Sequence, residues 1–346
     1  MKYSIIIPVF NRPEEVDELL ESLLGQEEKD FEVVIVEDGS QIPCKEVCGK
    51  YADRLDLHYY QKENSGPGQS RNYGAERAGG DYLLILDSDV VLPRGYLRAV
   101  SEELDRKPAD AFGGPDRAHD SFTDTQKAIS YSMTSFFTTG GIRGGKKKLD
   151  KFYPRSFNMG IRRDVYQELG GFSKMRFGED IDFSIRIFKA GKHCRLFPEA
   201  WVWHKRRTDF RKFWRQVYNS GIARINLYRK YPDSLKPVHL LPMVFTVGII
   251  FLSLLSLCGI IMLSLPSTKS TGCFLLLLGL IPLLLYSAVI CIDSSRQNHS
   301  LKIGLLSIRA AFTQLTGYGC GFISAWWKRC VCGKDEFSAY NKNFYK

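Results

Sequence analysis

The first ninety residues alternate short apolar runs with a segment of helical periodicity. Runs at 4–10, 31–36 and 82–86 have the length of buried strands, and 55–60 is a candidate for another. Residues 13–24 place apolar side chains at helical spacing with acids between them, behind a proline that suits a first helical turn. The pattern therefore begins as strand, helix, strand.

A second helix is expected from near Ser70 to Gly79-Gly80, which completes strand, helix, strand, helix, strand. That order is typical of an open parallel α/β sheet. In such sheets ligands collect at the carboxyl ends of the strands, where Asn11, Asp38 and Asp87 all fall.

The strongest chemical signal at this edge is Asp87-Ser88-Asp89, directly after the run at 82–86. Two carboxylates at this spacing can converge where a strand opens into a loop, and burying either charge unpaired would be very costly. A cation or polar ligand is therefore expected, and hard oxygen ligands favour Mg²⁺ or Mn²⁺. Two acids that merely face water are the alternative.

Two long apolar stretches dominate the second half of the chain. Residues 237–268 and 270–292 contain no Asp, Glu, Lys or Arg, and either is long enough for the ~20 apolar residues that span a bilayer. Their prolines, Pro242 and Pro282, are tolerated better in membrane helices than in soluble ones. We expect two transmembrane helices within 237–292, and the alternative is a buried hairpin in a soluble core.

Positive charge predicts how these helices are oriented. The chain carries a formal net charge of +10, and 205–230 holds nine Lys and Arg against one acid. Such a segment beside a span belongs on the cytoplasmic side near anionic lipid, so we expect a basic interfacial helix there and a basic cytoplasmic tail at 328–346. Interleaved aromatics also suit nucleic acid, but the adjacent span favours lipid, and no nucleic-acid partner is expected.

Residues 301–327 are expected to lie on the membrane or to pack on the hairpin. A third span would reverse the side of the tail and would place Arg309 at depth. The segment instead has an amphipathic helical stripe and ends in Trp326-Trp327, which suit the headgroup level.

The cysteines do not indicate a zinc site. The nine are odd in number, and Cys44-x3-Cys48 and Cys330-x-Cys332 lack further close Cys or His pairs. Reduced thiols in a cytoplasmic domain fit this pattern best.

Five ordered blocks resemble the family 2 glycosyltransferases, which have the nucleotide-diphospho-sugar transferase fold called GT-A. The blocks are Ile5 to Asn11, Val36 to Ser40, Gly66 to Asn72, Leu86 to Asp89, and Gly170-Gly171-Phe172 followed by Gly178 to Phe183. The resemblance covers about residues 1–230. It implies an α/β GT-A domain over 1–230, with a nucleotide-sugar half at 1–110, an acceptor half at 111–204 and the basic helix at 205–230.

The resemblance also implies the residues that bind the donor. These are Pro8, Phe10, Asn11, Asp38, Arg71, Asp87 and Ser88. The first three would line the base and ribose pocket, and the aspartate at 38 would accept a hydrogen bond from uracil. Taken alone, Asp38 before Gly39 also suits a simple turn. A guanidinium at Arg71, near a helix start, can pair with phosphate oxygens, although a surface arginine is the plainer interpretation.

The expected metal ligands are Asp87, Asp89 and His204. The resemblance places Asp89 on a metal that holds the diphosphate, and many related transferases complete the site with a histidine at the position of His204. A lone histidine between aromatics is otherwise usually a packed residue. Imidazole suits Mn²⁺ better than Mg²⁺, so a divalent metal, Mg²⁺ or Mn²⁺, is the expected cofactor.

Glu179 and Asp180 are the candidate catalytic residues. They precede a helical apolar stripe, where an acid can also serve as a simple N-terminal cap. Transfer of a sugar to a hydroxyl needs a general base within hydrogen-bond reach. The family comparison assigns that role to Asp180, with Glu179 contacting the acceptor or orienting the base.

The sequence therefore predicts a metal-dependent, inverting transferase, multi-pass in an inner or plasma membrane, with its catalytic domain in the cytoplasm. The sugar would move from a nucleoside diphosphate, with UDP favoured, to a hydroxyl of a lipid-linked or membrane-proximal glycan in cell-surface polysaccharide synthesis. Processive synthases carry Gln-x-x-Arg-Trp, which is absent after Gln216, so one sugar is expected per encounter. A polyprenyl-phosphate sugar synthase, a nucleotidyltransferase and a silent membrane scaffold are the alternatives.

Overall fold

The computed structural model describes residues 2–117, 122–139, 152–175, 177–205 and 207–334. The chain divides into two compact units. Of the described residues, we call 2–117, 152–175 and 177–205 the sheet unit, and 122–139 and 207–334 the helical unit. The expected domain end at 230 stays a prediction, and the contacts of the structure group 206–230 with the helical unit.

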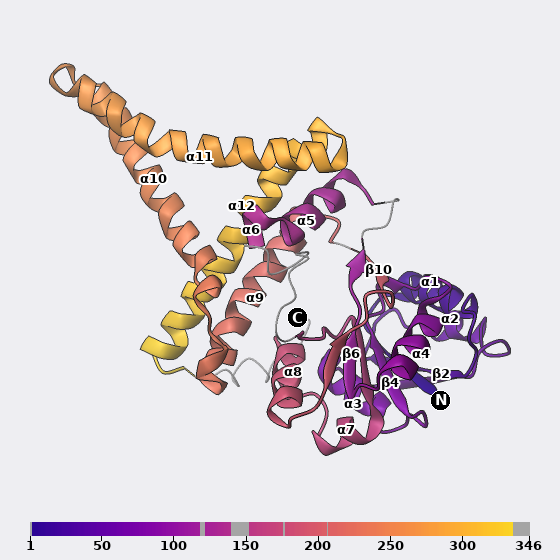
Figure 1. Cartoon of the computed structure of the whole chain (residues 1–346). Coiled ribbons are helices and arrows are strands. Elements are labelled where there is room, and N and C mark those ends of the chain that lie inside the picture. The colour runs from indigo at the N-terminus through magenta and orange to yellow at the C-terminus, as the bar shows by residue number, and fades with distance from the viewer. Residues whose placement is uncertain (1, 118–121, 140–151, 176, 206, 335–346) are drawn as a thin grey trace. The chain divides into compact units, whose positions relative to one another are not determined.

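The sheet unit is built on a seven-stranded sheet with the order β3-β2-β1-β4-β8-β6-β9. Figure 1 labels β2, β4 and β6 of this sheet and the helices around it. Its strands are β1 (Tyr3–Val9), β2 (Phe31–Asp38), β3 (Leu57–Lys62), β4 (Tyr82–Leu86), β6 (Ala111–Gly113), β8 (Asn158–Arg162) and β9 (Cys194–Leu196). The first four strands in the order are mutually parallel, whereas β8 runs antiparallel to both β4 and β6. The parallel arrangement expected for the strands before residue 90 is therefore confirmed, and the later strand β8 makes the whole sheet mixed.

Helices cover both faces of this sheet, which explains why its central strands are continuous apolar runs. Successive side chains of a strand point to opposite faces, so Ile5 and Ile7 of β1 join one buried cluster and Ile6 joins the other. The first cluster includes side chains of α1 (Pro13–Leu24), α2 (Lys45–Gly49) and α4 (Tyr96–Arg106). The second includes side chains of α3 (Pro67–Ala75), α7 (Arg163–Glu168) and α8 (Glu179–Lys189).

Helix α3 begins at Pro67, three residues before the expected start near Ser70, and ends at Ala75, before the expected end at Gly79-Gly80. Gly66 takes a left-handed φ of 91° immediately before it, and a proline suits the first helical turn. The earlier start places Arg71 in the middle of the helix, on its buried side.

A small second sheet connects distant parts of the sheet unit. It contains β5 (Val90–Val91), β7 (Asp116–Arg117) and β10 (Val202–His204), in the order β5-β10-β7. His204 pairs with Val90, which directly follows Asp89. Main-chain pairing therefore brings residue 204 to the Asp-x-Asp motif.

The helical unit contains α5 (Asp124–Thr134), α6 (Phe136–Thr139), α9 (Phe210–Lys230), α10 (Leu241–Leu263), α11 (Lys269–Asn298) and α12 (Leu301–Trp326). Short helical turns cover Pro232–Ser234, Pro237–His239, Pro266–Thr268 and Trp327–Val331. Helix α12 packs against α5, α9, α10 and α11. It approaches α9 closely, because a Cβ on Gly221 would lie 2.2 Å from the carbonyl oxygen of Tyr318.

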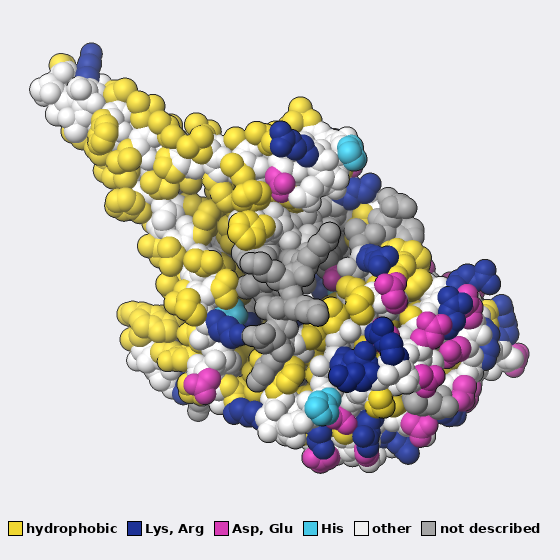
Figure 2. Space-filling view, viewed as in Figure 1, with side chains coloured by type: hydrophobic (Ala, Val, Ile, Leu, Met, Phe, Trp, Pro, Cys, Tyr) yellow, Lys and Arg dark blue, Asp and Glu magenta, His cyan; other side chains and the backbone are white. Residues whose placement is uncertain are grey.

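Two helices of this unit, Pro237–Leu263 and Pro266–Asn298, are long and apolar enough to cross a membrane, with mean hydropathies of 2.6 and 2.7. The first range contains α10 and the second contains α11, and these two helices pack on each other. Figure 2 shows hydrophobic side chains along their surface. The two apolar helices expected within 237–292 are thus present. By length and composition alone they are weak evidence for a membrane. The expected helix at 301–327 is α12, which packs on both of them.

Candidate active site

The ends of β1 and β2 are tied together by Asn11, which has a left-handed φ of 54°. Its side-chain oxygen accepts hydrogen bonds from the backbone N–H groups of Gln41 and Ile42 at 2.7 and 3.0 Å. Its own N–H donates to Ser40 Oγ at 2.7 Å. Because β1 and β2 are neighbours, Pro8, Phe10 and Asn11 lie at the same sheet edge as the end of β2, as expected from the sequence.

Asp38 is buried at the carboxyl end of β2, and hydrogen bonds and an ion pair fix the orientation of its carboxylate. It accepts hydrogen bonds from the backbone N–H groups of Ser65 and Gly66, each at 2.9 Å, and pairs with the ammonium group of Lys62. The contacts hold Asp38 against the loop that leads into α3, which is more than a simple turn requires. Its role toward uracil stays a prediction.

Asp87, Asp89 and His204 converge at the end of β4, where one ligand atom from each lies within 4.8 Å of the others. The Nε2 atom of His204 lies 3.2 Å from Asp89 Oδ1. The imidazole ring stacks on Phe157 with ring centroids 4.8 Å apart, which fixes its plane. Ser88, between the two aspartates, is buried.

Two arginines balance these carboxylates. Arg12 Nη1 lies 2.6 Å from Asp89 Oδ2, and Arg71 Nη2 lies 2.7 Å from Asp87 Oδ1. The guanidinium of Arg71 also reaches Glu179 Oε1 at 3.3 Å, so it joins the Asp-x-Asp motif to the candidate catalytic pair. Burial opposes the charge of Arg71, but the carboxylates of Asp87 and Glu179 outweigh it and raise its pKa.

Glu179 and Asp180 open helix α8, after Gly178 with a left-handed φ of 83°. Asp180 Oδ1 accepts a hydrogen bond from the Ile181 N–H at 2.8 Å, and its Oδ2 lies 3.2 Å from Arg155 Nη1. Burial, and then the neighbouring charge of Asp180, raise the pKa of Glu179. The site thus holds two adjacent carboxyl groups with different environments.

Helix α3 is fastened to the loop before α8 by Asn72. Its amide donates to the Phe172 carbonyl oxygen at 2.8 Å and accepts from the Phe172 N–H at 2.8 Å and the Tyr166 hydroxyl at 2.6 Å. Gly171 adopts a φ of 63° there, and a Cβ on it would lie 2.4 Å from Asn72 Oδ1. This junction fixes Arg71 relative to Glu179.

Comparison with known proteins finds a family match for nearly half of the chain. Residues 4–170 match the model of Glycosyl transferase family 2. The chain carries a glycosyl transferase family 2 domain. A solved mannosyltransferase, PcManGT from Pyrobaculum calidifontis in complex with GDP-Man and Mn²⁺, has the same fold, with a TM-score of 0.58 and 17% identity over 95% of this chain and 88% of that one. The fold of the sheet unit is accordingly GT-A-like.

Curated relatives match the family 2 domain over shorter stretches. The poly(ribitol-phosphate) beta-N-acetylglucosaminyltransferase TarS of Staphylococcus aureus is 34% identical over 114 residues, which are 32% of this chain and 20% of that protein. The pre-mycofactocin glycosyltransferase of Mycobacterium tuberculosis is 26% identical over 255 residues, 68% of this chain and 49% of that protein. The chain thus spans between a fifth and half of the length of these relatives.

Three basic side chains of the family 2 domain were not identified from the sequence. Arg12 could have been found, because it follows β1 at the sheet edge where the acids gather. Lys62 likewise ends β3 beside Asp38. Arg155 lies outside any strand or helix, and no periodicity points to it.

The three possible metal ligands at the end of β4 fit a divalent cation. Two carboxylates and one imidazole suit Mn²⁺ in particular, and His204 approaches Asp89 from a separate strand. The surrounding charges agree with this. Carboxylates at 87, 89, 179 and 180 outnumber the guanidinium groups at 12, 71 and 155, and Asp116 Oδ2 adds a further carboxylate 3.9 Å from His204 Nδ1.

Proposed function

We propose that this chain is a metal-dependent, inverting glycosyltransferase that moves a sugar from a nucleoside diphosphate donor, with UDP favoured, to a hydroxyl group. The observation that carries the proposal is the connection through Arg71. This one guanidinium contacts Asp87 of the Asp-x-Asp motif and Glu179 of the candidate catalytic pair. A donor-binding edge and a candidate base therefore belong to one site.

The charges of the site suit a diphosphate. Without a cation the carboxylates of the site outnumber its guanidinium groups, and a divalent cation would offset this excess of negative charge. Asp87, Asp89 and His204 would hold the cation, which would offset negative charge on the departing diphosphate. Arg12 and Arg71 already lie against the same carboxylates and would face the phosphate oxygens.

Asp180 would act as the general base. The acceptor oxygen forms a bond to the anomeric carbon while the bond from that carbon to the diphosphate oxygen breaks. The proton of the acceptor hydroxyl passes to a carboxylate oxygen of Asp180. A single displacement of this kind inverts the anomeric centre. Glu179, paired with Arg71, would keep the neighbouring charges in place.

A second acceptor class is favoured by Arg155. Its guanidinium lies 3.2 Å from Asp180 Oδ2, and its side chain is 34% exposed, whereas that of Arg71 is 3% exposed. An accessible cation beside the acceptor carboxylate would suit an acceptor that is itself an anion, such as polyprenyl phosphate. Such an acceptor is ionised at neutral pH and needs no general base.

The acceptor is proposed to lie at a membrane, as part of a lipid-linked or membrane-proximal glycan for the cell surface. The proposal rests on α10 and α11, whose surfaces are largely apolar, and on the basic residues of α9. By the positive-inside tendency, the sheet unit and the C-terminal segment would lie in the cytoplasm.

The test is to incubate the full chain with a panel of nucleotide sugars, with Mn²⁺ or with EDTA, and to measure release of nucleoside diphosphate. We expect release from one or a few donors, dependent on the metal. When pyrophosphate is added, formation of a nucleoside triphosphate and a sugar phosphate from the nucleotide sugar would instead identify a nucleotidyltransferase. Failure to consume any donor with either acceptor class would contradict the proposal and favour the silent membrane scaffold.

A further inference from the structure

A second group of possible metal-ligating side chains lies at the amino ends of β2 and β3, away from the carboxyl ends that form the candidate active site. Glu32 is the second residue of β2, His58 is the second residue of β3, and Asp56 precedes β3. Asp38, at the other end of β2, is six residues from Glu32, about 20 Å at ~3.3 Å per residue. The group is therefore separate from the proposed active site.

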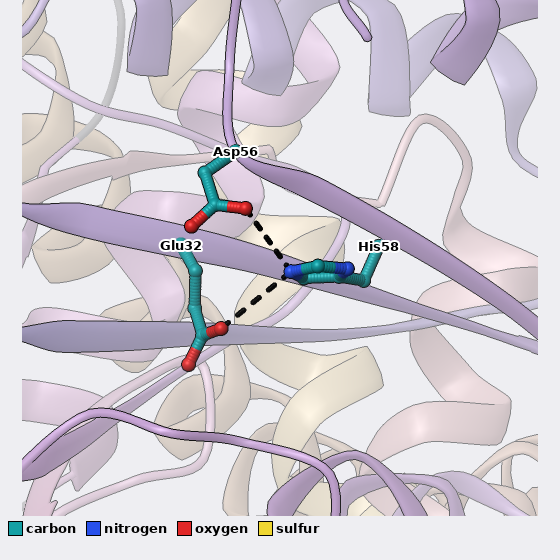
Figure 3. Close-up of side chains that lie close together, drawn as sticks. All are labelled: Glu32, Asp56 and His58. Atoms are coloured by element: carbon teal, nitrogen blue, oxygen red, sulfur yellow. Dashed lines mark ion pairs between the residues drawn. The ribbon is translucent and has the colours of Figure 1, made fainter.

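The three side chains converge on one point, as Figure 3 shows. His58 Nε2 lies 3.1 Å from Asp56 Oδ1 and 3.6 Å from Glu32 Oε2, and the ring nitrogen points between the two carboxylates. Ligand atoms of all three residues lie within 4.8 Å of one another. This is the arrangement in which one cation can contact all three.

Glu32 is fixed in place near the start of β2, where the residue is 5% exposed. Its Oε1 accepts hydrogen bonds from Ser4 Oγ at 2.5 Å and from the Gly79 N–H at 2.6 Å. Its Oε2 is aimed at His58 and, among the described residues, makes ion-pair contacts but no hydrogen bond. Glu32 therefore presents an oriented carboxylate oxygen to His58.

The ammonium group of Lys2 forms ion pairs with both acids of the group. Its ammonium lies 3.3 Å from Asp56 Oδ2 and 3.9 Å from Glu32 Oε2. The side chain is 42% exposed, so it can turn into solvent when another cation binds. His58 and Asp56 are 43% and 51% exposed, which gives an ion access from solvent.

We propose that Glu32, Asp56 and His58 form a second divalent-cation site, which Zn²⁺ can occupy. Two carboxylate oxygens and one imidazole nitrogen are ligands that Zn²⁺ accepts, and a water molecule would complete a tetrahedral set. The hydrogen bonds to Oε1 orient the Glu32 carboxylate, as partners outside the first ligand shell do in zinc proteins. The ion would fasten the start of β3 to β2.

The experiment measures Zn²⁺ binding by titration calorimetry on the full chain without a histidine tag, in an Asp89→Ala background that removes the proposed active-site ligand. We expect one Zn²⁺ per chain. His58→Ala and Asp56→Asn should each weaken binding at least tenfold, and Lys2→Ala should strengthen it. His193→Ala changes an exposed histidine outside the group and should leave binding unchanged.

Absence of Zn²⁺ binding in the Asp89→Ala background would overturn the proposal, and so would binding that neither His58→Ala nor Asp56→Asn weakens. If the background variant does not fold, the same titration on otherwise unaltered protein decides, because His58→Ala should then lower the number of bound ions by one. An unchanged number would contradict the proposal. Neither result depends on the proposed transferase activity.

Discussion

At the scale of single residues, Arg155 decides between the two acceptor classes. If the acceptor is an anion, Arg155→Ala should lower transfer by at least about tenfold, mainly through a higher KM for the acceptor, because one charge-assisted contact is worth ~1.5–3 kcal/mol. If the acceptor is a hydroxyl, the same variant frees Asp180 from its ion pair, and the KM should change little. Steady-state transfer to both acceptor classes distinguishes these outcomes.

The metal ligands should differ in their contribution. Asp89→Ala should abolish transfer, because Asp89 would hold the cation and also pairs with Arg12. His204→Ala removes one ligand of three and should raise the Mn²⁺ concentration needed for half-maximal activity by about 10–100-fold, as weakened metal sites do. Circular dichroism would confirm that both variants fold. Full activity of both in EDTA would show that the site does not use a metal.

At the scale of secondary-structure elements, the junction between α3 and the loop before α8 keeps Arg71 near Glu179. Gly170 and Gly171 both have left-handed φ values, so alanine at either position is strained by ~1–2 kcal/mol. Only at 171 would the added Cβ also collide with Asn72, whereas it meets nothing within 4 Å at 170. Gly171→Ala should therefore lower the thermal midpoint more than Gly170→Ala, and it should also weaken donor binding. Equal shifts would show that the contact with Asn72 carries no stability.

The elements that the sequence predicts well are those with a single strong signal. β1, β2 and β4 are apolar because helices cover both sheet faces, and α1 has a full helical stripe. β8 has no such signal. Its Gly160 lies against the ring of Phe112. The strand pairs antiparallel with β4 and β6, which both lie far from it in the sequence. Long-range pairing of this kind leaves no local periodicity.

The candidate site likewise combines residues with a strong local sequence signal and residues that only long-range contacts bring in. The Asp-x-Asp motif follows a clear strand, and His204 was expected beside it only through the resemblance to a family. Its actual position depends on pairing of β10 with β5, two strands of three and two residues. Arg155 enters through a tertiary contact that no spacing in the sequence encodes, whereas the place of Arg12 directly after β1 was a usable signal.

At the scale of the whole molecule, the helical unit predicts a defined topology. α10 and α11 expose large apolar side chains along most of their length, which is unusual for a soluble protein and suits lipid. In a variant without other cysteines, Cys330 should react with a membrane-impermeant maleimide in inverted vesicles, whose cytoplasmic face is outward. It should not react in intact cells. Thr268→Cys, in the turn between α10 and α11, should react only from the opposite face. Reaction of both from the same face would exclude the hairpin.

The central claim is that one site binds a nucleotide sugar and removes the acceptor proton through Asp180. The most direct test measures donor binding and single-turnover transfer to a hydroxyl acceptor by the Asp180→Asn variant. We predict unchanged donor affinity and transfer slowed by about 10²–10⁴-fold, the usual contribution of a positioned base. Unchanged transfer by Asp180→Asn would contradict the account, and transfer to polyprenyl phosphate at the full rate would promote the synthase alternative.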